Sequence, residues 1–169
     1  SREAMTRSRP RVARAAPDGF GWIPPAVVEL GEPDKSHGRF RTATLAGYWK
    51  AFERARPAIN VGTFVGAGGV RDLVIGKEGR PATREELSAM EAAVARAMED
   101  GAFGLSTSLR YVPDRFASTE EIITLAKVAA RYGGTYITHQ RDEGDGIDAS
   151  LDEVFRIARE ARIPTQIHH

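Results

Sequence analysis

The sequence contains no cysteine among its 169 residues, so no disulfide and no thiolate metal site can form within it. It has no uninterrupted apolar run near the roughly 20 residues that span a bilayer, and no signal peptide is visible. Neither sign of charge dominates, because 24 basic and 23 acidic residues give a formal net charge of +1. We therefore expect no membrane segment and no nucleic-acid partner. A cytoplasmic location is expected, although the absence of cysteine does not decide the compartment, and export of the parent protein and the oligomeric state stay open.

Apolar residues make up 41% of the chain and charged residues 28%, which is typical of a globular protein with a real hydrophobic core. Residues 1–41 are rich in proline, glycine and arginine, and we predict a loop-rich N-terminal segment there. Residues 42–169 carry regular patterns and form the predicted folded part. Because the chain opens without a clear start and stops on the apolar run "QIHH", we expect a segment of a longer protein.

The pattern from residue 42 onward alternates between helix and strand. Apolar spacing predicts helices at 44–55, 83–101 and 118–133, with a further helix from Ser150 to before Pro164. Strands are predicted at 102–109, 135–139 and 165–169, and residues 58–69 are predicted as a buried strand followed by a glycine loop. Three of the helices are expected to begin with a capping box, at Thr83–Glu86, Ser118–Glu121 and Ser150–Glu153.

Strands that alternate with helices of this length predict an α/β protein with a parallel sheet. About four such units with short connections favour part of a (β/α)8 barrel, and an open doubly wound sheet is the alternative. The run "GAGG" at 66–69 lacks the full G-x-G-x-x-G fingerprint, since Val70 and Arg71 follow it. A nucleotide-binding domain that uses this run is therefore a weak alternative.

Two histidines follow predicted strands, where parallel α/β folds place their functional sites. His139 and His169 are 30 residues apart, about one βαβ repeat, so we expect them at the same height on neighbouring strands. Imidazoles on strands about 4.8 Å apart can share one metal ion. The alternative is that each histidine has a purely structural role.

A cluster of charge follows His139. Asp142 or Glu143 is predicted to accept a hydrogen bond from the second ring nitrogen of a metal-bound histidine, as carboxylates near metal sites do. Arg141 is predicted either to neutralise these carboxylates or to hold an anionic substrate in a bidentate pair. The alternative is a solvated loop of salt bridges that opens the next helix.

The stretch "GAFGLSTSLRYVPDRFASTEEIITLAKVAARYGGTYITHQRDEGD", residues 101–145, resembles the N-acyl-D-amino-acid deacylases (D-aminoacylases) of the amidohydrolase superfamily. The resemblance extends upstream through "AINVGTFVGAGGVRDLVIG" and downstream through "LDEVFRIAREARIPTQIHH", so that it covers roughly residues 45–169. It implies a metal-dependent (β/α)8 barrel that hydrolyses the amide bond of a small N-acylated D-amino acid.

The resemblance also implies roles for individual residues. His139 and His169 correspond to ligands of one or two zinc ions, and His168 lies beside a ligand as a supporting residue. Tyr111 of "YVP" corresponds to a tyrosine that contacts the substrate. Ala67 stands where many members have a histidine, which leaves the substrate subgroup open.

Other parts of the family's site have no counterpart in these 169 residues: the His-x-His of the first strand, a bridging cysteine, a lysine after the last histidine and the catalytic aspartate. We therefore expect no catalytic general base in this chain, and no activity and poor stability from the chain alone. Two alternatives remain, a cyclic-amide hydrolase like the hydantoinases and dihydroorotases, and a non-catalytic barrel. "GLSTSL" lacks the carboxylated lysine usual in the cyclic-amide enzymes, which argues against the first.

Overall fold

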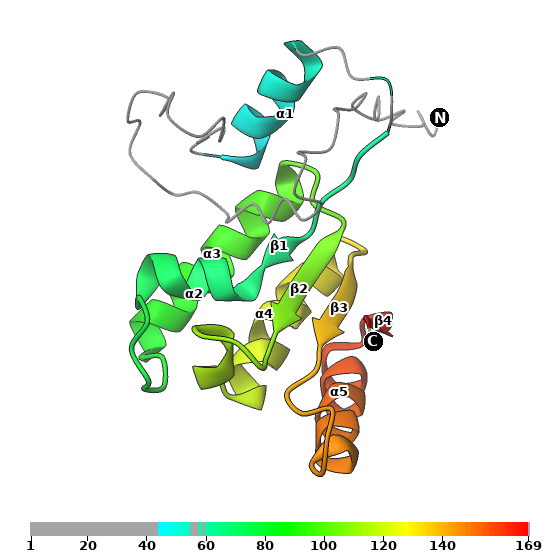
Figure 1. Cartoon of the computed structure of the whole chain (residues 1–169). Helices are drawn as coiled ribbons and strands as arrows, with labels where there is room; N and C mark the ends of the chain where they lie inside the picture. Colours follow the sequence, from blue (N-terminus) through cyan, green and yellow to red (C-terminus); the bar gives the residue numbers. More distant parts are fainter. Residues whose placement is uncertain (1–43, 55–57, 59, 169) are drawn as a thin grey trace, which may run out of the picture.

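The computed structural model describes residues 44–54, 58 and 60–168, so the predicted loop segment 1–41 and His169 lie outside the described residues. The described elements are helices and strands in alternation (Figure 1). The strands are β1 (Val65–Gly66), β2 (Gly104–Ser108), β3 (Thr135–His139) and β4 (Thr165–Ile167). The helices are α1 (Leu45–Arg54), α2 (Ala67–Val74), α3 (Arg84–Glu99), the 3-10 helix η1 (Asp114–Phe116), α4 (Thr119–Arg131) and α5 (Ile147–Ala161).

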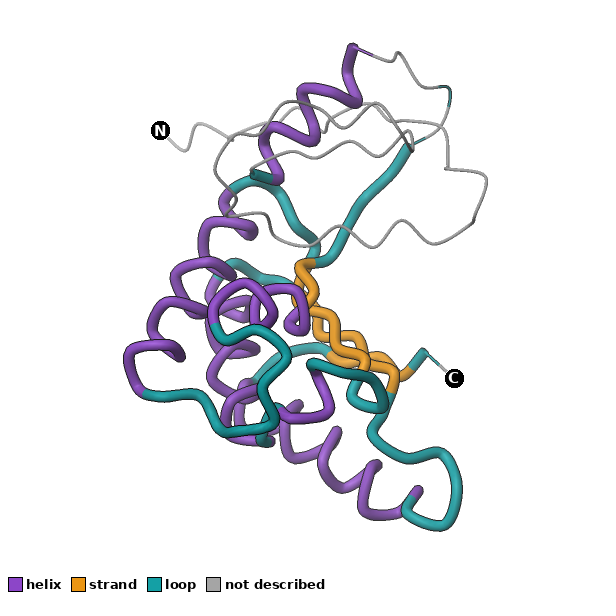
Figure 2. Tube along the Cα trace, turned by 60° about the vertical axis from the view of Figure 1, so that its left-hand side comes forward, coloured by secondary structure: helices purple, strands orange, loops and turns teal. Residues whose placement is uncertain are grey.

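The four strands form one parallel sheet in the order β1-β2-β3-β4. Helices α2 to α5 contact one another in chain order, and they lie on one side of the strands (Figure 2). A doubly wound sheet reverses its strand order and carries helices on both faces. The described sheet does neither, so the predicted partial (β/α) barrel is confirmed over these strands.

The side chains of the sheet separate into a buried face and an open face. Leu105 and Tyr136 are paired in register and both fully buried, as are the next pair toward the carboxyl end, Thr107 and Thr138. The Thr107 hydroxyl lies 2.7 Å from the Tyr136 hydroxyl and donates to Thr138 Oγ1 at 2.8 Å, so the polar atoms of this face satisfy one another. Side chains alternate along a strand, which leaves His139 on the opposite, open face.

The helix from residue 83 to 101 is confirmed in detail. Thr83 caps α3 and accepts from the Glu86 backbone N–H, while the Glu86 carboxylate accepts from the Thr83 N–H at 2.8 Å. Gly101 and Gly133 follow α3 and α4 with φ of 101° and 71°, backbone angles that side chains resist. Both glycines therefore end helices, as predicted.

The other two predicted capping boxes differ from the structure. Ser118 caps α4, but Glu121 does not close the box, because its carboxylate pairs with Arg71 instead. The box at Ser150–Glu153 is wrong: α5 already begins at Ile147, with Gly146 as its cap. Tertiary contacts outcompete the local cap at both carboxylates, since each pairs with a partly or fully buried arginine.

The glycine loop predicted after β1 is also wrong, because the glycines open helix α2. A Cβ on Gly68 would lie 2.8 Å from Asp114 Oδ1, so the helix accepts glycine in order to pack closely against that carboxylate. In the part of the chain that the structure describes, no helix is both long and apolar enough to cross a membrane.

Candidate functional site

The carboxyl ends of β2 and β3 lie side by side and place their last residues together. Ser108 pairs in register with His139, and the Leu109 N–H donates to the His139 carbonyl at 2.9 Å. Two loops start from this edge. We call residues 109–118 the Tyr111 loop and residues 140–146 the Arg141 loop.

Tyr111 lies against His139, so two residues predicted for the site are brought together. The Tyr111 N–H donates to the Ser108 carbonyl at 2.9 Å, which turns the chain back over the end of the sheet. The two rings meet edge to face, with centroids 5.3 Å apart and planes at 84°. Tyr111 is 58% exposed, which leaves much of its ring accessible to a ligand beside His139.

The His139 ring has contacts that suit a metal ligand. Its Nδ1 lies 3.2 Å from the Gln140 carbonyl and 4.0 Å from Glu143 Oε1. A proton on Nδ1, donated to the Gln140 carbonyl, places the lone pair on Nε2, the arrangement that metal-binding histidines adopt. Glu143 lies near the His139 ring, 4.0 Å from Nδ1, and its predicted hydrogen bond to a metal-bound His139 stays a prediction.

Asp142, the other carboxylate predicted behind His139, shapes the Arg141 loop. Its Oδ1 accepts from the Gly144 N–H at 2.7 Å, and its own N–H donates to Ser150 Oγ at 2.7 Å. These are the bonds of a turn anchored to helix α5. The described contacts of Asp142 therefore serve the loop's shape.

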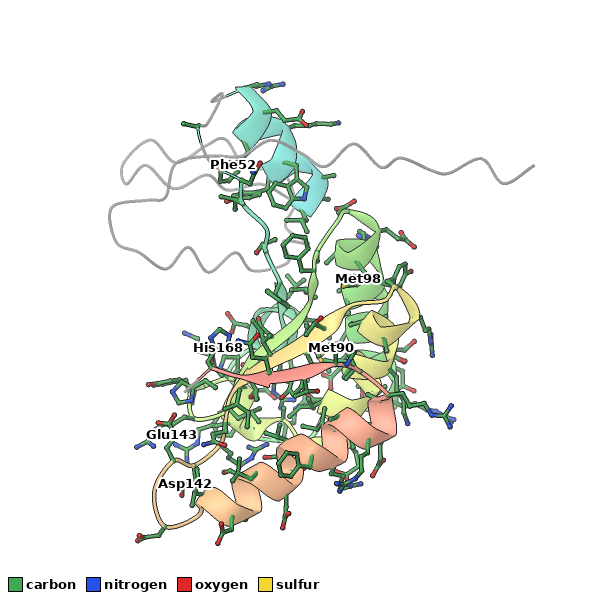
Figure 3. The ribbon with its side chains drawn as sticks, turned by 90° about the vertical axis from the view of Figure 1, so that its right-hand side faces the viewer. Phe52, Met90, Met98, Asp142, Glu143 and His168 are labelled. Carbon is green, nitrogen blue, oxygen red and sulfur yellow. The ribbon has the colours of Figure 1, made fainter. Side chains whose placement is uncertain are left out.

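The remaining predicted histidines lie at the end of β4. His168 is exposed, and its N–H donates to the Thr138 carbonyl at 2.9 Å. Figure 3 shows His168 at the same end of the sheet as Glu143 and Asp142. His169 lies outside the described residues, and among those that are described no group of three His, Cys, Asp or Glu side chains could hold a metal ion. The predicted pair of His139 and His169 thus stays a prediction.

Arg141 is tied into the protein by four hydrogen bonds. Its Nε and Nη2 donate to the two carboxylate oxygens of Glu153, both at 2.9 Å. Its Nη1 and Nη2 also donate, at 3.0 Å each, to the carbonyls of Arg115 and Ala117 in the Tyr111 loop. Both edges of the guanidinium fork are therefore occupied, which does not favour the predicted bidentate grip on a substrate.

Asp114 of the Tyr111 loop is a buried carboxylate that the sequence did not single out. Its Oδ2 accepts from the Ser108 N–H at 2.6 Å, while Oδ1 has no hydrogen-bond partner and is buried. Burial is the main cause that raises the Asp114 pKa to about 6, and the Glu121 charge adds to it. In sequence, "YVPDRF" resembles an ordinary turn, so no local signal marks this aspartate as buried.

A buried ion pair lies beside Asp114. Arg71 of α2 donates from Nη1 to both Glu121 carboxylate oxygens, at 2.8 and 2.6 Å, and from Nη2 to the Arg80 carbonyl. Arg71 is 1% exposed, so this pair is desolvated and depends on good geometry. It fixes the start of α4 against α2, and with it the far end of the Tyr111 loop.

Comparison with known proteins gives a consistent set of relatives, although no family model matches the sequence. The chain is 40% identical over 146 residues to a D-aminoacylase of Alcaligenes xylosoxydans xylosoxydans, covering 86% of this chain and 30% of that protein. It is 38% identical over 127 residues to an N-acyl-D-glutamate deacylase of the same organism, covering 75% and 26%. The chain thus spans less than a third of the length of these curated relatives.

Solved structures agree. A D-aminoacylase described as defining a novel subset of amidohydrolases matches with a TM-score of 0.72 and 42% identity, over 75% of this chain and 27% of that one. A D-aminoacylase structure concerned with a binuclear metal centre gives 0.75 and 37%, over 83% and 31%. An N-acyl-D-glutamate deacylase from Bordetella bronchiseptica, in complex with zinc and a phosphonate inhibitor, gives 0.69 and 35%, over 73% and 26%.

The predicted resemblance is confirmed by sequence and by fold. The partial coverage is consistent with a central segment, as the resemblance implied. The chain is homologous to a segment of the D-aminoacylases and N-acyl-D-amino-acid deacylases, and over that segment it has their amidohydrolase fold.

Proposed function

We propose that this chain is the central part of a metal-dependent amidohydrolase that hydrolyses N-acyl-D-amino acids to a carboxylate and a D-amino acid. The observation that carries the proposal is the contact of Tyr111 with His139 at the carboxyl ends of β2 and β3. It brings a metal-ligand type and an accessible aromatic ring together where barrel enzymes hold their sites. The solved relatives include a zinc complex and a binuclear metal centre, which supports one or two zinc ions here.

His139 fits the role of a zinc ligand, because its Nδ1 lies by the Gln140 carbonyl and Glu143 and so orients Nε2 for metal. His169 is proposed as the second ligand from this chain, with His168 as a supporting neighbour. A bound zinc ion lowers the pKa of a water molecule and polarises the scissile carbonyl. The other ligands and the aspartate that moves the proton are proposed to lie in parts of the enzyme beyond these residues.

Tyr111 is proposed to contact the substrate, since its ring flanks His139 and is more than half exposed. Asp142 and Glu143 support the His139 side of the site, one by shaping the Arg141 loop and the other beside the ring. The partner is a small molecule. A cytoplasmic location is part of the proposal, and cell fractionation tests it.

The test uses the full-length enzyme and follows hydrolysis of N-acetyl-D-methionine and its L enantiomer, with and without a chelator. We expect D-selective turnover that the chelator removes, and loss of turnover together with bound zinc in His139→Ala. Arg156→Ala is the control, because Arg156 is a half-exposed residue of α5 that pairs only with Glu120 and Glu160 in the described contacts. Bound zinc with no turnover of either enantiomer would contradict the substrate class and point to cyclic amides. Absence of both metal and turnover would contradict the catalytic proposal.

A further inference from the structure

Arg141 joins the two loops that form the candidate site. It is the second residue after β3, yet its guanidinium reaches the carbonyls of Arg115 and Ala117 near the end of the Tyr111 loop. Hydrogen bonds from a charged donor are stronger than those between neutral groups, so two such bonds to these carbonyls hold that end of the loop. The side chain is 33% exposed; its bond to the Ala117 carbonyl is partly shielded from water, whereas the bond to the Arg115 carbonyl is exposed.

Glu153 holds the guanidinium at this position. Its two oxygens accept from Nε and Nη2 of Arg141, and Oε1 also accepts from Thr119 Oγ1 at 2.7 Å. Thr119 is the first residue of α4, directly after the Tyr111 loop, and Glu153 belongs to α5. A single carboxylate therefore ties both helices to the arginine.

The occupied donors of Arg141 argue against its predicted role as a substrate anchor. A bidentate grip uses either the Nε–Nη2 edge or the Nη1–Nη2 edge of the guanidinium. Glu153 fills the first edge, and the two carbonyls fill the second. Binding a substrate carboxylate in either way would break bonds that hold the loop.

We propose that Arg141, fixed by Glu153, is a positioning residue that sets Tyr111 of the neighbouring loop against His139 and thereby determines how substrate is held. This inference rests on the proposed function only for its kinetic test. The Tyr111 loop is anchored at its start by backbone bonds of Leu109 and Tyr111 and in its middle by Asp114, which accepts from the Ser108 N–H. The second anchor at its far end is Arg141. With the second anchor removed, the ring of Tyr111 loses its fixed distance from His139.

The first test needs no activity. Amide hydrogen exchange is measured on full-length holoenzyme for wild type, Arg141→Lys and Arg156→Lys. Lysine keeps the positive charge but cannot reproduce the fork, so we expect exchange in residues 109–118 to become about tenfold faster in Arg141→Lys. Exchange in α3 should stay unchanged, and Arg156→Lys should match wild type throughout. Unchanged exchange in residues 109–118 would overturn the inference, whatever the substrate proves to be.

The second test is a double-mutant cycle on N-acyl-D-amino-acid hydrolysis. We expect Arg141→Lys to lower kcat/KM about tenfold, mainly through KM, at unchanged zinc content. In a Tyr111→Ala background, Arg141→Lys should have little further effect, because Arg141 acts only by positioning the Tyr111 ring that the variant lacks. Additive losses would show that Arg141 touches substrate independently of Tyr111 and would overturn the positioning role. If the wild-type enzyme shows no turnover, the proposed function is wrong, and the hydrogen-exchange test still decides whether Arg141 positions the Tyr111 loop.

Discussion

Asp114 keeps its carboxyl group almost entirely out of water while accepting only one described hydrogen bond, from the Ser108 N–H. Burial raises its pKa from the usual value near 3.8 to about 6, so the folded state binds a proton more tightly than the unfolded chain does. The unfolding free energy therefore falls as pH rises from about 4 to about 6, and the cost of the buried charge stays constant above that range.

Asp114→Asn removes this titration and retains an oxygen that can accept from Ser108. We expect the variant to gain stability relative to wild type as pH rises from 4 to 8, by up to about 3 kcal/mol for a shift of about two pKa units. Urea unfolding of the full-length protein at several pH values measures the difference. A difference that does not change with pH would show that Asp114 is ionised at no net cost, for example through water at Oδ1.

Gly68 shows a second constraint at the scale of single residues. A Cβ at this position would lie 2.8 Å from Asp114 Oδ1, and both Gly68 and Asp114 are buried. We expect Gly68→Ala to destabilise the enzyme by about 1–3 kcal/mol, although alanine favours helices. The melting temperature measures this effect. The reverse substitution, Ala95→Gly in the middle of α3, is the comparison: it removes a methyl group and is expected to destabilise through lost helix propensity.

At the scale of elements, the helix α3 could be predicted from sequence in detail, because its cap is local: Thr83 and Glu86 satisfy one another across three residues. Helix α5 could not be predicted equally well. Ser150 and Glu153 have the same spacing, yet Ser150 accepts from the Asp142 N–H and Glu153 from Arg141. These partners lie in the preceding loop, and a pattern search over neighbours in sequence cannot distinguish a cap from a tertiary contact.

The local cap of α3 is open to a direct test. Thr83→Ala removes the oxygen that accepts from the Glu86 N–H, and we expect the unfolding free energy to fall by about 1 kcal/mol. Ser88→Ala, at an exposed position of the same helix, should be neutral or slightly stabilising because alanine has the higher helix propensity. Equal effects of the two substitutions in denaturant unfolding would contradict the capping role.

At the scale of the whole molecule, the difference between local and long-range contacts also decides which parts of the site the sequence can predict. The place of His139 at the end of a strand could be predicted, and the structure brings Tyr111 against it, while the roles of both residues stay predictions. Asp114 and the true partners of Arg141 could not be predicted, because they depend on which loops the parallel sheet brings together at its carboxyl edge. Long-range contacts decide the surroundings of these charged side chains, and residue type alone does not reveal them.

Metal removal joins the site to the stability of the whole enzyme. A zinc ion that binds only the folded state stabilises it by mass action, about 2.7 kcal/mol when free metal is 100 times its dissociation constant. We therefore expect a chelator to lower the melting temperature of the full-length protein by several degrees, and added zinc to restore it. His139→Ala should start from the lower melting temperature and respond to neither reagent, because its proposed ligand is gone. Arg156→Ala should behave as wild type, and an undiminished chelator response in His139→Ala would mean that the metal is held without His139.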